Sequence, residues 1–211
     1  MKITKLGHCC LVIEDRGVRV LTDPGAWTQT QNEQRDIDIV LITHEHNDHF
    51  HIESLKIVLH NNPAAIVITN SGVGKRLEAE GIACRLVADG QTHDQGNLKI
   101  SGFGQDHAPI YPGFPTVINT SYFIGEGFFY PGDALYIPPR PVELLALPVC
   151  GPWLKIAEAI DYAKAVKPQQ AFPVHDGMLK IFGPFHALPQ RELAAANIVF
   201  TPLVAGDTLE L

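Results

Sequence analysis

The stretch IDIVLITHEHNDH, residues 37–49, decides the fold of this chain. Its first half, Ile37 to Thr43, is a short apolar run of the kind that forms a buried strand. After the stretch, Ile52 to Leu59 carries its apolar residues at helical spacing. The sequence therefore places a loop rich in histidine and carboxylate side chains where a strand turns into a helix.

The hexapeptide His44-Glu45-His46-Asn47-Asp48-His49 has the composition of a metal site. In an extended segment His44 and His46 project to the same side, so their two imidazoles can converge on one ion. Asp48 and His49 then point elsewhere and can serve a second ion. A chance cluster in a surface loop is the alternative, but the expected chance count of H-x-H-x-D-H at this composition is only about one in a thousand. The hexapeptide thus predicts a two-ion site.

The rest of the chain alternates short strands with βα units. Strands are expected over residues 3–6, 9–14, 18–22, 65–69, 82–87, 98–103, 120–124, 128–130, 142–149, 171–174 and 208–211, and further helices over 73–80, 153–166 and 190–196. This order predicts an α/β (α+β) fold, a four-layer αββα sandwich of two mixed β-sheets. No linker or repeat divides the chain, so residues 1–211 are expected to form a single domain.

Composition narrows the class of function. The formal net charge is −7 and no basic run is present, which argues against a nucleic-acid partner. The sequence shows neither a signal peptide nor a membrane span, so a cytoplasmic location and a small-molecule substrate are expected. The spacing of Cys9, Cys10, Cys84 and Cys150 fits neither a zinc knuckle nor a redox pair, which favours small buried hydrophobes.

Three further residues of metal-ligand type come directly after expected strands. They are His107, Asp133 in Pro131-Gly132-Asp133, and His175 in Pro173-Val174-His175. A zinc ion takes four or five ligands and a catalytic ion keeps one place for water, so the hexapeptide needs such additions. Strand ends at one edge of a sandwich would bring them together in a cleft.

This series of motifs resembles the metallo-β-lactamase superfamily over essentially the whole chain. Leu6-Gly7-His8 and Leu21-Thr22-Asp23-Pro24 are similar to its branch of small, single-domain metal-dependent hydrolases, which includes the ascorbate-6-phosphate lactonase type. The resemblance implies two metal ions, with Asp133 bridging them. It assigns His44, His46 and His107 to the first ion and Asp48, His49 and His175 to the second.

The implied activity is hydrolysis by a metal-activated water, with Asp48 as the catalytic residue that orients the water. Zinc is the expected metal, and manganese, nickel or iron would also suit nitrogen and oxygen ligands. The substrate would be a small ester, lactone, thioester or phosphodiester. A phosphodiesterase or nuclease acting on nucleic acid and a non-catalytic metal-binding protein are the alternatives.

Residues beside the motifs allow two interpretations each. His8 could lie near the metal site or in the core, and Asp23 could accept a hydrogen bond from a metal-bound imidazole or only start a turn. Segments 109–115 and 178–186 could wall the substrate pocket, where Lys180 and His186 could meet an anionic group, or they could be surface loops.

Overall fold

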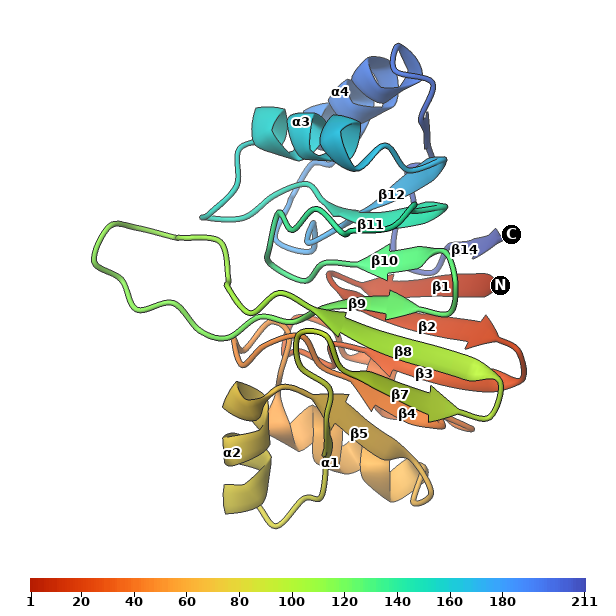
Figure 1. Ribbon diagram of the computed structural model, residues 1–211, viewed down its shortest axis with the longest axis vertical. Helices are drawn as coiled ribbons and strands as arrows, with labels where there is room; N and C mark the ends of the chain where they lie inside the picture. The colour runs from red at the N-terminus through yellow and green to blue at the C-terminus, as the bar shows by residue number, and fades with distance from the viewer.

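Two seven-stranded sheets face each other in the middle of the molecule, and helices cover the outer face of each sheet (Figure 1). The computed structural model describes all residues from 1 to 211. Its four layers are helices, sheet, sheet and helices, which confirms the αββα sandwich of two mixed sheets. None of the helices has the length and apolar character that a bilayer crossing requires.

The first sheet has the strand order β14-β1-β2-β3-β4-β5-β6. β1, β2 and β3 pair antiparallel, whereas β3 to β6 pair parallel. The parallel part requires crossover segments, and two of these contain the outer helices α1 and α2. The elements are β1 (Lys2–Gly7), β2 (Cys10–Asp15), β3 (Val18–Thr22), the short 3-10 helix η1 (Thr30–Glu33), β4 (Ile39–Leu41), α1 (Ile52–Asn61), β5 (Ile66–Thr69), α2 (Ser71–Ala79), β6 (Arg85–Leu86) and β14 (Thr208–Glu210).

The second sheet repeats this plan with the order β13-β12-β11-β10-β9-β8-β7. β7 to β10 pair antiparallel and β10 to β13 pair parallel. Helices α3 and α4 cover its outer face (Figure 1). The elements are β7 (Thr92–Gln95), β8 (Leu98–Phe103), β9 (Ser121–Ile124), β10 (Phe128–Tyr130), β11 (Leu144–Pro148), α3 (Ile156–Val166), β12 (Gln170–Val174), α4 (Gly183–Ala194) and β13 (Val199–Phe200).

Side-chain alternation along the strands builds separate cores. In β2, Leu11 and Ile13 point between the sheets, whereas Cys10 and Val12 point toward α1 and α2. Because both faces of the central strands are buried, these strands are apolar at successive positions. The layered core therefore follows directly from the period of two.

Several elements differ from the sequence expectation. The last helix begins at Gly183, well before residue 190, because Pro184 suits a first helical turn. Pro189 lies inside that helix and interrupts the apolar period that would have revealed it. The strand expected over residues 82–87 is reduced to Arg85–Leu86 at the sheet edge, while the polar segment Thr92–Gln95 forms an edge strand that its composition hides.

Candidate metal centre

The seven side chains of metal-ligand type meet at one edge of the sandwich. The parallel strands β4, β10 and β12 end at this edge, and His44, Asp133 and His175 follow them within a few residues. His107 comes in the same way after β8. Strand ends thus bring these residues to one edge, as the sequence predicted. The side chains that meet there are His44, His46, Asp48, His49, His107, Asp133 and His175.

The Asp133 carboxylate lies at the centre of this group. Its Oδ2 is 3.0 Å from His175 Nε2 and 3.4 Å from His107 Nε2, and its Oδ1 is 3.1 Å from His49 Nε2. His44 Nε2 lies 3.8 Å from Oδ2. One carboxylate therefore faces imidazoles from both proposed ion positions, which is the arrangement of a bridging ligand.

His44, His46 and His107 form one side of the site together with Asp133. The ligand atoms of these four residues all lie within 4.8 Å of one another. The imidazole rings meet edge to face, with centroids 4.7 to 5.0 Å apart. Their nitrogens are thus directed at a common point, as the first ion would require.

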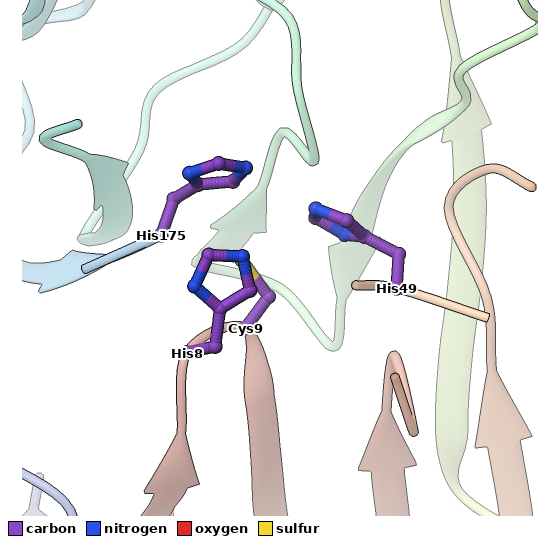
Figure 2. Close-up of side chains that lie close together, drawn as sticks. All are labelled: His8, Cys9, His49 and His175. Carbon is purple, nitrogen blue, oxygen red and sulfur yellow. The ribbon is translucent and has the colours of Figure 1, made fainter. Parts of the chain in front are cut away.

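Asp48, His49 and His175 form the other side. Asp48 Oδ2 lies 3.5 Å from His175 Nε2 and 3.8 Å from His49 Nε2. Figure 2 shows His49 and His175 directed toward each other, with His8 and Cys9 close by. The Cys9 thiol was expected to be a plain core residue. It does pack between the sheets. Burial alone would raise the pKa of this thiol, but the neighbouring imidazoles of His8, His49 and His175 outweigh that effect and lower the pKa to about 7.

Hydrogen bonds at the rear nitrogens fix the tautomers of two histidines. Asp23 Oδ2 accepts from His49 Nδ1 at 2.8 Å, so the Nε2 lone pair of His49 faces the site. The Thr43 hydroxyl donates its single hydrogen to Asp23 Oδ2, and it therefore accepts from His44 Nδ1 at 3.0 Å. The His44 Nε2 lone pair is then also free. Asp23 holds a metal-site imidazole in addition to shaping its turn.

Buried polar atoms without partners show that the site fits a cation. His107 donates from Nδ1 to the Ala108 carbonyl, which leaves its Nε2 free. The Nε2 atoms of His44, His49, His107 and His175, together with Asp133 Oδ1, are buried and make no hydrogen bond. Such atoms are costly unless something satisfies them, and five of them converge here on one volume. Divalent metal ions are the group that this donor set would satisfy.

The ionisation states agree with this conclusion. Burial lowers the pKa of His44 well below its usual range, so the imidazole is neutral as a ligand must be. Burial alone would raise the pKa of Asp133, but the His175 and His49 imidazoles outweigh it and hold the carboxyl ionised. Asp133 in turn raises the pKa of His49 and His175 well above the usual value, against their desolvation. The Asp133 carboxylate thus favours positive charge beside it. Metal ions would supply that charge in place of the protons on His49 and His175.

His8 lies at the site but is not a free ligand. Its Nδ1 accepts a hydrogen bond from the Gly177 amide at 3.1 Å, so its Nε2 carries the hydrogen and donates to Asp48 Oδ2 at 3.2 Å. Its ring also packs against His175, with centroids 4.2 Å apart. His8 therefore orients Asp48 instead of contributing a nitrogen to the ions.

Backbone contacts hold the hexapeptide loop against the loop after β3. Ala26 donates its amide hydrogen to the Asn47 carbonyl at 2.8 Å, and His51 donates to the Pro24 carbonyl at 3.2 Å. A Cβ at Gly25 would lie 1.8 Å from the Asp48 carbonyl oxygen, so only glycine permits this approach. The two loops pack as one unit beneath the candidate metal centre.

Lys5, Asp176 and His186 form a buried network behind His175. Lys5 Nζ lies 2.8 and 2.7 Å from the two Asp176 oxygens and also donates to the Pro173 and Leu203 carbonyls. His186 Nε2 lies 3.0 Å from Asp176 Oδ2. The sequence left open whether His186 meets an anionic group of the substrate, and the structure instead places its Nε2 against the Asp176 carboxylate.

A cleft of about 590 Å³ opens above the site. Ile110 and Met178 line it, which favours the pocket-wall interpretation of their segments, but Lys180 does not. Trp27 and Trp153 also line it, and the sequence analysis missed both. Trp153 Nε1 donates to Asp133 Oδ2 at 2.8 Å. The signal was present, since Gly151-Pro152-Trp153 follows a strand end just as the ligand residues do.

Comparison with known proteins agrees with the fold. The model of a β-lactamase superfamily domain matches residues 2–175. Protein Rv0786c of Mycobacterium tuberculosis is 35% identical over 184 residues, which cover 85% of each chain. A UPF0173 metal-dependent hydrolase of Carboxydothermus hydrogenoformans is 26% identical, over 83% of this chain and 84% of its own. The solved structure of a metallo hydrolase from Ignicoccus hospitalis superposes with a TM-score of 0.78 at 20% identity, covering 100% of this chain and 98% of the other.

The fold and the site together define a small metal-dependent hydrolase. The chain belongs to the metallo-β-lactamase superfamily, as its leading motifs indicated.

Proposed function

We propose that this protein hydrolyses a small ester, lactone, thioester or phosphodiester at a two-metal centre. His44, His46 and His107 would hold one ion, Asp48, His49 and His175 the other, and Asp133 would lie between them. The observation that carries the proposal is the set of five buried, unpartnered nitrogen and oxygen atoms on His44, His49, His107, Asp133 and His175. Zinc is the first choice of metal, and manganese, nickel or iron suit the same donors.

Divalent ions in this position supply Lewis acidity, which polarises a carbonyl or phosphoryl oxygen and lowers the pKa of water toward neutrality. The protein supplies the orientation. Asp48 lies at the floor of the cleft, and although burial would raise its pKa, the His175 and His8 imidazoles hold that pKa below the usual range. Its carboxylate accepts from His8 on one oxygen and can accept a hydrogen bond from the attacking water. Asp48 would therefore aim the water.

Trp153 and Asp23 act on the surrounding ligands. The Trp153 indole fixes the bridging carboxylate through Oδ2, and Asp23 fixes the ring of His49. Both groups hold a ligand in the orientation that a cation needs, which commonly changes metal affinity or activity by about ten- to a hundredfold.

Metal analysis and turnover test this function together. Protein reconstituted with zinc is expected to hold about two equivalents of metal per chain and to hydrolyse 4-nitrophenyl esters, lactones or bis(4-nitrophenyl) phosphate. The triple variant His44→Ala, His46→Ala and His107→Ala should keep only the second ion. Retention of both ions by this variant would refute the assignment of the first site, and inertness of the fully loaded protein toward these three substrate classes and toward thioesters would refute the proposed hydrolase function.

A further inference from the structure

The cleft above the metal centre has a polar floor and apolar walls. The floor is made by His46, Asp48, Asp133 and His175. The walls carry Trp27, Ile110, Trp153 and Met178. Trp27 is 49% exposed and Met178 is 40% exposed, so large apolar surfaces face solvent at the mouth of the cleft. Exposed apolar area around a polar floor is typical of a pocket that binds an apolar ligand.

The walls contain no cationic side chain. None of the residues that line the cleft is a lysine or an arginine. The nearby cation Lys5 is buried against Asp176, and His186 also contacts that carboxylate. A phosphate or carboxylate on the remote part of a substrate would lose its water here without gaining a partner, which is unfavourable.

We infer that the substrate is an uncharged ester, lactone or thioester whose remote part is apolar and packs against Trp27, Ile110 and Met178. This inference rests on the proposed function and narrows it, since it selects the neutral carbonyl substrates over phosphodiesters and sugar phosphates. In the reaction the water oxygen bonds to the carbonyl carbon and the carbon–oxygen or carbon–sulfur bond breaks. The alcohol or thiol leaves with one proton of the water, and the acid product retains the hydroxyl oxygen.

A pair of matched substrates tests the inference by turnover. 4-Nitrophenyl pentanoate and the mono-4-nitrophenyl ester of glutaric acid have acyl chains of equal length, but the second ends in a carboxylate. The zinc-loaded protein should show a kcat/KM for the pentanoate at least about tenfold higher, a discrimination that one group in a pocket can provide. Bis(4-nitrophenyl) phosphate should be slower still. Equal or faster hydrolysis of the glutarate ester, or faster hydrolysis of the phosphodiester, would overturn the inference.

A charge variant with a matched control locates the effect in the cleft. Met178→Lys adds a cation to the wall and should shift the glutarate-to-pentanoate ratio of kcat/KM by at least about tenfold toward glutarate. Ile181→Lys adds the same charge three residues away, at a side chain that is 74% exposed and does not line the cleft. It should leave the ratio unchanged. An equal shift in both variants, or none in Met178→Lys, would contradict the assignment of the wall.

Binding can be measured without turnover because both tryptophans of the chain line this cleft. The neutral ketone 4-phenyl-2-butanone, which cannot be hydrolysed, should change tryptophan emission of the zinc-loaded protein saturably, and Met178→Glu should weaken its binding at least about tenfold. Binding without hydrolysis of any ester would refute the proposed function and leave the apolar pocket standing. Hydrolysis of esters without ketone binding, or without a preference for the neutral pentanoate ester, would support the proposed function and refute the apolar pocket.

Discussion

The two halves of the chain contribute to the metal centre in different ways. The first half supplies four side chains from the single loop of residues 44–49, which follows β4. The second half supplies His107, Asp133 and His175 from three separate loops. A contiguous loop can keep its own geometry, whereas dispersed residues meet only when the second sheet is complete. We therefore expect the loop of residues 44–49 in the first half to be preformed, and the second half to complete the metal centre.

The largest effect is expected from the central residue of the dispersed set. Asp133→Ala should lower kcat by about a thousandfold, the loss that follows removal of a preorganised electrostatic group, and should reduce binding of both ions. His46→Ala, in the contiguous set, should weaken the binding of only one ion, because its imidazole is grouped with His44, His107 and Asp133 alone. Asp106→Ala, an exposed neighbour of His107, is the control. If Asp133→Ala and Asp106→Ala show the same kcat and the same metal content, Asp133 is not the central residue of the dispersed set.

The link between the halves can be broken at Lys5. Lys5→Met leaves the buried Asp176 carboxylate without its cation, and the free energy of unfolding in urea should fall by about 3 to 5 kcal/mol. The double variant Lys5→Met/Asp176→Leu should recover most of this loss, because apolar side chains can replace a buried ion pair.

Lys2→Met serves as the control for Lys5. Lys2 pairs with Glu14 at the surface, where an ion pair contributes at most about 1 kcal/mol. If Lys5→Met is no more destabilising than Lys2→Met, the buried network does not join the halves.

Substitution of Asp23 tests how far the loop of residues 44–49 is preformed. Asp23→Asn places an amide against donors from Thr43 and His49, and it should cost about 2 to 3 kcal/mol of unfolding free energy. Metal affinity should also fall by about ten- to a hundredfold, since the His49 ring loses its anchor. Asp38→Asn, which changes a part-buried acceptor of a single backbone bond remote from the ions, is the comparison. Unchanged metal affinity in Asp23→Asn would show that the loop geometry does not depend on this carboxylate.

The smallest expected effect is at His8. His8→Ala should lower kcat about tenfold, because Asp48 loses the donor that orients it, while metal content stays the same. His8→Gln retains an N–H that can reach Asp48 and should restore part of the activity. Loss of metal in His8→Ala, measured by elemental analysis, would instead make His8 a ligand.

The sequence predicted the layers and the ligand-type residues because both depend on local rules. Alternation along β2 sorts its side chains between two cores, and strand ends bring His107 and His175 to one edge. The walls of the cleft were less predictable. Trp27 and Trp153 reach the cleft through loop paths that periodicity does not constrain.

Lys5 was missed although its signal was local. It occupies an inward position two residues after Ile3, and the sequence offers no sign that its partner lies 171 residues away. A lone cation in the inward register of an apolar strand is therefore worth a search for a distant carboxylate. The length of α4 was hidden in a similar way, since Pro189 breaks its apolar period.

The close approach at Gly25 has a consequence for how such proteins diversify. Because the loops beneath the candidate metal centre are joined through backbone atoms, a substitution on another loop of the cleft does not need to be accommodated by them. Ile110 and Met178 lie in the walls on such other loops, where side chains can be exchanged one at a time. New substrate preferences can thus evolve, or be engineered, while the metal centre stays unchanged.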